Sequence, residues 1–211
     1  MKRMEEQNMI FGPLPTTPLL IVISGPSGIG KDAVVGLLRK TNTDIHFVIT
    51  MNSRQPRADE VEGRDYFFVS REEFVEKIAN DELIEYAKVY SDYKGIPKSQ
   101  VREAFASGKD VVMRLDVQGA MTIRKLCPGA ILIFLTARSR DEWVNRLLER
   151  RSETPEELDL RMRVAAKEFE MLKNFDYLVI NSDKHLDQTI ADIQAIIRAE
   201  HLKTCPRSVD L

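Results

Sequence analysis

The 211-residue sequence predicts an α/β fold in which helices cover both faces of a parallel sheet. Short apolar runs alternate along the chain with stretches of helical periodicity, which is the order that parallel α/β sheets require. The first run, LLIVIS at 19–24, is apolar up to its final serine, as expected of a strand buried on both faces. A glycine-rich loop and then a helical pattern follow it, so the fold begins with a strand, a loop and a helix.

The remaining elements are predicted from the same periodicities. We expect strands at about 19–24, 45–50, 111–116, 130–136 and 177–180, and helices near 31–40, 98–107, 118–126, 139–151, 156–174 and 186–202. Between the second and third strands, residues 51–97 carry aromatic and β-branched segments around a short helix at 71–80, which predicts a small mixed lobe. The charged segment 150–158 contains Pro155 and is predicted to be an exposed connection between helices.

The glycine-rich loop has the spacing of a phosphate-binding loop. Residues 25–32 read GPSGIGKD, which matches G-x-x-x-x-G-K but ends in aspartate where serine or threonine is expected. Glycines let backbone N–H groups face an anion, and Lys31 adds a mobile positive charge. The alternative is a glycine-rich turn without a ligand. The candidate ATP-binding residues here are Gly25, Pro26, Ser27, Gly28, Ile29, Gly30, Lys31 and Asp32.

Composition excludes several classes of function. Lysine and arginine number 31 against 33 aspartates and glutamates, so no broad positive field favours a nucleic-acid polymer as partner. Two cysteines, Cys127 and Cys205, and three histidines supply neither a disulfide framework nor a metal cluster, which suits a reducing interior. No apolar run is long enough to span a membrane, and residues 1–18 lack the core of a secretory signal. We therefore expect a soluble intracellular protein.

Two sets of arginines could complete a site for phosphate chemistry, because a phosphoryl group in transfer needs positive charge from several sides. Arg54 and Arg57 follow the end of the second predicted strand, where ligands bind in open α/β sheets. Arg150, Arg151 and Arg161 lie on the charged connection and the helix after it, and could close over the reacting group. Either set, taken alone, could equally be solvated surface.

Over roughly residues 19–200 the chain resembles the guanylate kinase family. The resemblance rests on six segments in the family's order: GPSGIGK at 25–31, SRQPR at 53–57, EVEGRDYFFVS at 60–70, LIEYA at 83–87, LDVQGA at 115–120 and RRSET at 150–154. It implies a P-loop three-layer fold and transfer of the ATP γ-phosphoryl group to GMP, and to dGMP, with Mg²⁺. We accordingly expect one domain at 19–203, with its core at 19–50, 98–149 and 163–203, a GMP-binding lobe at 51–97, a lid at about 150–162, and tails at 1–18 and 204–211.

The resemblance also implies roles for individual residues. It assigns the GMP phosphate to Arg54, Arg57 and Tyr66, the guanine to Thr50, Glu85 and Asp116, and the adenine of ATP to Asn181 and Ser182. Lys94 could serve the GMP phosphate as a point charge, and Lys31, Arg54, Arg150 and Arg161 are the candidates for neutralising the charge of the transferring group. Guanine presents N1–H and its amino group side by side, and one carboxylate can accept both, whereas adenine places an acceptor at N1. Glu85 should therefore select guanine, unless it is an outward-facing strand residue. Asn181 could instead cap the next helix.

Three features depart from the family's pattern. Lys94 stands where a tyrosine often contacts the GMP phosphate, and Ile96 stands where a serine lies near the base. Asp32 replaces the usual magnesium-binding hydroxyl, while Arg114 replaces a common acid on the strand expected beside the loop. The formal charges of a hydroxyl and a carboxylate sum to minus one, whereas those of Asp32 and Arg114 sum to zero. We hypothesise that these two pair without nucleotide, with Mg²⁺ held by ATP phosphates, water and Asp32 itself. The alternative is that Arg114 turns away.

Two other functions stay open: a non-catalytic guanylate kinase-like interaction module, and a kinase of the same shape for another small phosphate acceptor. Lys31, Arg150 and Arg161 argue against the first, and Glu85 with Thr50 argues against the second. The Lys-Asp pair after the loop, KGIP at 94–97 and Arg114 resemble the plastid or mitochondrial enzymes of plants, so we expect either organelle, or otherwise the cytoplasm. No transit peptide is visible. The expected partners are ATP and GMP, without a membrane, and the expected state is a monomer or weak homodimer.

Overall fold

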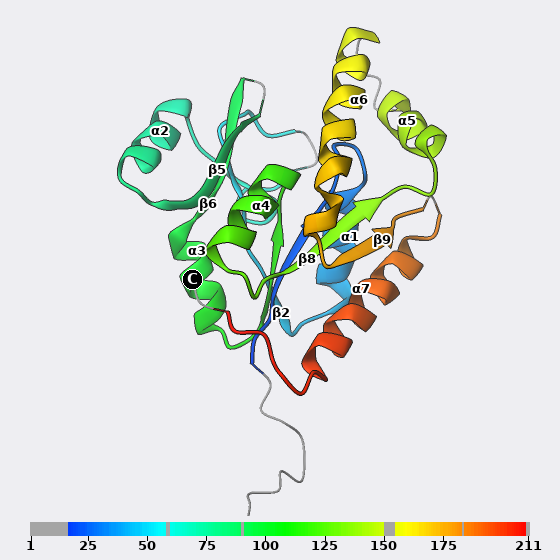
Figure 1. The fold of residues 1–211 in the computed structure, drawn as a ribbon. Coiled ribbons are helices and arrows are strands. Elements are labelled where there is room, and N and C mark those ends of the chain that lie inside the picture. The colour runs from blue at the N-terminus through cyan, green and yellow to red at the C-terminus, as the bar shows by residue number, and fades with distance from the viewer. Residues whose placement is uncertain (1–16, 58–59, 90, 150–154, 183, 210–211) are drawn as a thin grey trace, which may run out of the picture.

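A five-stranded parallel sheet forms the core of the computed structural model, which describes residues 17–57, 60–89, 91–149, 155–182 and 184–209 (Figure 1). The strand order is β2-β7-β1-β8-β9, and every neighbouring pair is parallel. This confirms the predicted fold class. The strands are β1 (Leu20–Ser24), β2 (Ile45–Phe47), β7 (Asp110–Arg114), β8 (Ile131–Thr136) and β9 (Tyr177–Ile180).

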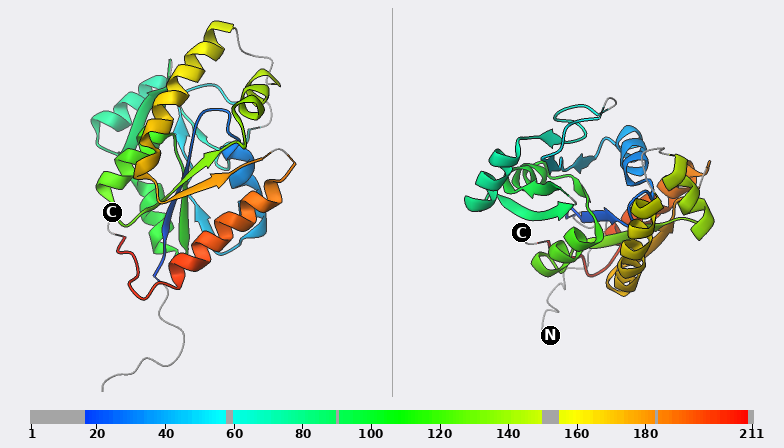
Figure 2. Two further views of the ribbon diagram at one scale, coloured as in Figure 1. Left: turned by 45° about the vertical axis from the view of Figure 1, so that its right-hand side comes forward. Right: turned by 90° about the horizontal axis from the view of Figure 1, so that it is seen from above.

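Helices cover both faces of this sheet and give the three-layer arrangement (Figures 1 and 2). Alternate residues of each strand point to opposite faces, so Ile21 and Ile23 pack with α1 and α7, whereas Leu20 and Val22 pack with α3 and α4. Burial on both faces explains the unbroken apolar run at the start of the chain. The helices are α1 (Lys31–Thr41), α3 (Lys98–Ala106), α4 (Val117–Leu126), α5 (Arg140–Glu149), α6 (Pro155–Glu170), the 3₁₀ helix η1 (Met171–Asn174) and α7 (Leu186–His201).

A second, mixed sheet lies beside the core, at the upper left of Figure 1. Its strands are β3 (Met51–Asn52), β4 (Phe67–Phe68), β5 (Leu83–Val89) and β6 (Asp92–Pro97), in the order β4-β3-β6-β5, with helix α2 (Arg71–Ala79) packed on them. Phe74 of α2 is fully buried in a small core of its own. Ser70 begins α2 with a capping box, in which its hydroxyl accepts a hydrogen bond from the Glu73 N–H (3.1 Å).

The structure differs from the predicted elements at several places. The second strand was predicted at 45–50, but β2 ends at Phe47, and the chain leaves the core sheet after Val48 to enter the second sheet. The predicted helix at 156–174 is divided into α6 and η1. At the C-terminus, Arg207 bonds to Glu200 and Asp176, so part of the expected tail packs on the core. Within the described ranges, no helix has the length and apolar character needed to cross a membrane.

Candidate active site

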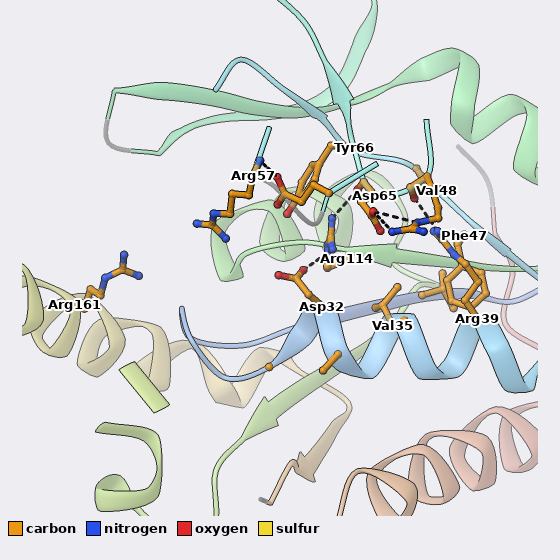
Figure 3. A pocket seen from close by; sticks show the side chains of 16 residues that line it. Asp32, Val35, Arg39, Phe47, Val48, Arg57, Asp65, Tyr66, Arg114 and Arg161 are labelled. Carbon is orange, nitrogen blue, oxygen red and sulfur yellow. Dashed lines mark hydrogen bonds and ion pairs between the residues drawn. The ribbon is translucent and has the colours of Figure 1, made fainter. Parts of the chain in front are cut away.

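An open cavity of about 820 Å³ lies between α1 and the second sheet (Figure 3). It lies at the carboxyl ends of β2 and β7, the edge at which open α/β sheets bind ligands. Arg57 and Arg161 point into it from opposite sides, although 104 positions separate them in the sequence. Asp32, Tyr66 and Arg114 line it as well. The fold thus gathers residues from the loop, the lobe and the predicted lid.

The phosphate-binding loop connects β1 to α1. Gly30 begins α1 with φ 92°, in the left-handed region that favours glycine, and a Cβ there would lie 2.5 Å from the Asn181 side-chain nitrogen. Asn181 donates a hydrogen bond to the Ile29 carbonyl (2.8 Å), and its own side-chain oxygen accepts one from Thr189 (3.2 Å). Asn181 and Ser182 are both buried. Asn181 therefore links the phosphate-binding loop to Thr189 on α7 through hydrogen bonds.

Lys31 lies against the loop that precedes it. Its ammonium group donates hydrogen bonds to the carbonyls of Gly25 and Pro26, the latter at 3.0 Å. Burial lowers the pKa of Lys31 to about 8, while the nearby carboxylates, Glu168 first among them, act to raise it. Lys31 is therefore mostly protonated at neutral pH, as binding to phosphates requires.

Helix α6 presents two charged residues to the loop. The Arg161 guanidinium donates a hydrogen bond to the Ser27 hydroxyl. Two turns further along, burial raises the pKa of Glu168 to about 7, and its buried Oε2 atom has no hydrogen-bond partner among the described residues. Glu168 could not be predicted as a site residue, because a glutamate within a helical segment is typical of any solvated helix face. Arg150 and Arg151, the other predicted lid arginines, lie outside the described residues.

A second residue that sequence analysis missed is Arg146, on α5. Its guanidinium donates hydrogen bonds to the carbonyls of Ile29 (3.2 Å) and Asn181 (2.6 Å) and pairs with Glu142 (2.7 Å). These bonds join the phosphate-binding loop to the end of β9. The i,i+4 spacing of Glu142 and Arg146 was the available signal, but it is typical of any solvated helix face.

Asp32 and Arg114 form the predicted ion pair. Arg114 does not turn away: Figure 3 shows the two side chains meeting above α1. The Asp32 side chain is 60% exposed, in the first turn of α1 beside Lys31. Among the described residues, no group of three or more His, Cys, Asp or Glu side chains could hold a metal. Asp32 is therefore an exposed carboxylate beside the phosphate-binding loop, a hard oxygen ligand of the kind that Mg²⁺ prefers.

The residues predicted to bind the GMP phosphate lie together, but one of them has an unexpected partner. Arg54 forms a two-pronged ion pair with Glu60, at 2.8 and 2.5 Å, and stacks over the Tyr66 ring at 5.3 Å. Glu60 also accepts a hydrogen bond from the Arg57 N–H (2.9 Å). The Glu60 carboxylate thus occupies the two-nitrogen edge of Arg54 that could otherwise bind a phosphate bidentately. Sequence analysis missed Glu60.

The fourth predicted phosphate ligand, Lys94, lies on β6. Burial lowers its pKa, as does the nearby charge of Arg114, whereas Asp116 and Asp32 act to raise it. Lys94 therefore interacts electrostatically with Arg54 of the predicted phosphate site and with Asp116 of the predicted base site.

Of the three residues predicted to bind guanine, Glu85 and Asp116 lie close together, and Thr50 and Glu85 are buried. Glu85 is only 6% exposed, so the outward-facing alternative is wrong. Its carboxylate lies against Gly119, where a Cβ would come within 3.0 Å of it. Burial raises the pKa of Glu85 to about 8, and the charge of Asp116 adds to the rise. Asp116 caps α4 by accepting a hydrogen bond from the Gly119 N–H (2.8 Å). Thr50 is buried and lies in the segment that connects β2 to β3.

Comparisons with known proteins agree with this geometry. The guanylate kinase family model matches residues 17–200. The chain is 46% identical over 198 residues to guanylate kinase 2, chloroplastic/mitochondrial, of Oryza sativa subsp. japonica, covering 93% of this chain and 70% of that protein. It is 42% identical over 193 residues to the guanylate kinase of Latilactobacillus sakei, covering 91% and 94%. A solved guanylate kinase from Anaplasma phagocytophilum superposes with a TM-score of 0.73 at 27% identity, covering 90% and 89%. This chain belongs to the guanylate kinase family.

Proposed function

We propose that this chain transfers the γ-phosphoryl group of ATP to GMP, giving ADP and GDP, and that the residues around the cavity carry out the transfer. The observation that carries the proposal is Glu85. Among the described residues, none donates a hydrogen bond to its carboxylate, although the side chain is buried. Desolvation and the charge of Asp116 disfavour the ionised form of this carboxyl group, and guanine supplies two adjacent donors that would stabilise it.

On the ATP side, the loop N–H groups and Lys31 bind the phosphates, and Asn181 and Ser182 shape the site from the end of β9. Lys31 must exchange the Gly25 and Pro26 carbonyls for phosphate oxygens, which a charged acceptor favours. Asp32 would hold Mg²⁺, directly or through water. When bound, this ion neutralises charge on the β- and γ-phosphates.

On the GMP side, Arg54, Arg57, Tyr66 and Lys94 bind the phosphate. Arg54 is ordered by Glu60 and by the Tyr66 ring, and it must exchange or share the Glu60 carboxylate when the phosphate binds. Thr50, Glu85 and Asp116 bind the base, which fixes the direction in which the GMP phosphate faces the loop.

The transfer needs no protein nucleophile. An oxygen of the GMP phosphate attacks the γ-phosphorus in line, and the protein supplies placement and positive charge. Arg161 is joined to the loop at Ser27, so closing α6 over the loop would bring its charge to the transferring group. We propose the same role for Arg150, and a lid at about 150–162 that excludes water when it closes.

A coupled assay that offers ATP with one acceptor at a time tests the proposal. GMP and dGMP should be turned over, and AMP, CMP and UMP should be about 100-fold or more slower, because each leaves Glu85 unsatisfied. Glu85→Gln should reduce this selectivity. Glu76→Gln, an exposed glutamate on α2 of the same lobe, is the matched control and should change nothing.

Two results of this assay would contradict the proposal. A preference for a sugar bisphosphate would indicate a kinase for another small acceptor. An absence of turnover with every acceptor, in protein that is folded, would indicate the non-catalytic interaction module.

We also propose a plastid or mitochondrial location and a monomer or weak homodimer. The name of the rice relative, which includes both organelles, supports the location. Fractionation of the source tissue with an antibody to this chain would test it, and recovery in the cytosol alone would contradict it. Sedimentation at several protein concentrations would test the oligomeric state, and a stable higher oligomer would contradict it.

A further inference from the structure

One guanidinium group touches both substrate sides of the cavity. Arg114 is the last residue of β7, and its side chain is 15% exposed. It pairs with Asp32 on α1, donates a hydrogen bond to the Asp65 carbonyl (3.1 Å), and lies over the Tyr66 ring with its Cζ atom 4.4 Å from the ring centre (Figure 3). Asp32 belongs to the ATP side, whereas Asp65 and Tyr66 belong to the lobe that binds GMP.

Only one of these three contacts is with an anion. A largely buried guanidinium needs a negative partner, because an uncompensated charge in such a site is costly. If the Asp32 carboxylate turned to a cation, Arg114 would retain only a neutral carbonyl and an aromatic ring. The Tyr66 ring contacts both the Arg114 and the Arg54 guanidinium groups. A GMP phosphate bound at Tyr66 would therefore supply Arg114 with a new anion.

The surrounding charges favour this exchange. Besides Arg114, the cavity is lined by the cations Arg39, Arg57, Arg64 and Arg161 and by the anions Asp32, Glu60 and Asp65. Lys94 interacts electrostatically with Arg114, Arg54, Asp32 and Asp116. Asp65 is paired with Arg64, and Glu60 with Arg54. Asp32 is thus the carboxylate that pairs with Arg114, and it directly follows Lys31 of the phosphate-binding loop.

We propose that Arg114 is a positioning residue that couples the two substrate sites. Asp32 holds it in the absence of nucleotides, and it turns to the GMP phosphate when the cation carried by ATP draws Asp32 away. This inference rests on the proposed function. It requires magnesium–ATP to tighten GMP binding, and by linkage GMP must tighten magnesium–ATP binding by the same factor.

Two substitutions separate this account from a merely structural ion pair, because only one of them should tighten GMP binding although both break the pair. Asp32→Ser releases Arg114 permanently, so GMP should bind several-fold more tightly without ATP. Arg114→Met removes the cation, so GMP binding should not tighten, and the coupling should disappear. In the double variant GMP should behave as in Arg114→Met, because Asp32 acts on GMP only through Arg114.

The experiment is calorimetric titration of GMP into the full chain, alone and with Mg²⁺ and a non-hydrolysable ATP analogue. The wild type should bind GMP about tenfold more tightly with the analogue, within the usual range of coupling between sites. Arg64→Met is the matched control, because Arg64 lines the same cavity and pairs with Asp65 but makes no contact with Asp32. It should keep the coupling. Thermal melts establish that each variant is folded, and Arg114→Lys offers a milder change if Arg114→Met is not.

Several outcomes would overturn the inference while the proposed function stands. One is independent binding of GMP and the analogue to the wild type. Another is coupling that survives in Arg114→Met, and a third is weaker GMP binding in Asp32→Ser. Coupling at full strength with the analogue and EDTA would refute the step in which the cation draws Asp32 away. Failure of the folded wild type to bind either nucleotide would instead refute the proposed function.

Discussion

Glu85 must lose a proton before it can bind guanine, and this requirement can be measured. Burial raises its pKa to about 8, so at pH 7 the carboxyl is mostly protonated in the absence of GMP. Only the carboxylate can accept both guanine donors. Deprotonation one unit below the pKa costs about 1.4 kcal/mol. GMP binding should therefore release nearly one proton at pH 7, and the fraction of protein ready to bind should rise roughly fivefold between pH 7 and pH 8.

Glu85→Gln should remove this proton release. The amide offers one acceptor and one donor, so it loses a charge-assisted hydrogen bond, worth about 1.5–3 kcal/mol, and faces a guanine donor with its own. The saved deprotonation cost offsets only part of this loss, so the KM for GMP should rise about tenfold or more. The KM for ATP should stay unchanged.

The same substitution has a signature in stability. The folded pKa of Glu85 lies above its ordinary value of 4.5, so the native state binds more protons than the unfolded chain between those values. The free energy of unfolding should therefore fall as pH rises from 4.5 to about 8 in the wild type. The free energy of unfolding of Glu85→Gln should not fall in this way, so at pH 7 it should exceed that of the wild type by about 3 kcal/mol.

Calorimetry of GMP binding in two buffers of different ionisation enthalpy counts the protons released. Urea titrations at several pH values give the stability difference. If the wild type released no proton on binding GMP, or if the glutamine variant released as many, the reasoning about Glu85 would be refuted.

Three further predictions concern other parts of the molecule. Gly119→Ala should raise the KM for GMP without changing that for ATP, because the added Cβ would lie 3.0 Å from the Glu85 carboxylate; equal effects on both substrates would count against it. Arg161→Ala should lower kcat about 100-fold or more with little change in GMP binding. Arg163→Ala is the control, because Arg163 is exposed, and it should leave kcat unchanged. If steady-state kinetics of Arg161→Ala showed a loss of GMP affinity alone, the proposed role would be contradicted. Burial acts to raise the pKa of Glu200, but three hydrogen-bond donors, the first of them Arg207, outweigh it and lower the pKa to about 2. The wild type should therefore lose stability as pH falls from 4.5 to 2, and Glu200→Gln should reduce this loss in urea titrations. An unchanged pH profile in the variant would refute the assignment.

Much of the fold and part of the site could be predicted because the signals are local. The phosphate-binding loop is a spacing of glycines and a lysine between a buried strand and a helix, so it needs no knowledge of distant residues. The pair of Asp32 and Arg114 could be predicted because two unusual charges stand at neighbouring positions of the fold. In both cases the chemistry is visible in the residue types themselves.

The remainder depends on contacts between distant residues with ordinary sequence patterns. Glu60 and Glu168 look like any solvated glutamates, and only the folded chain brings them to Arg54 and Lys31. The strand β6 was missed because glycine and proline are typical of turns. Gly95 is nevertheless a strand residue, since a Cβ there would lie 2.8 Å from the Glu85 carbonyl.

The most direct measurement is a crystal structure of the full chain with GMP and a non-hydrolysable ATP analogue. We predict that the guanine edge lies on the Glu85 carboxylate, that the GMP phosphate lies on Arg54, Arg57 and Tyr66, and that the ATP phosphates lie in the loop at 25–31. A base bound away from Glu85, or phosphates too far apart for in-line transfer, would contradict the account.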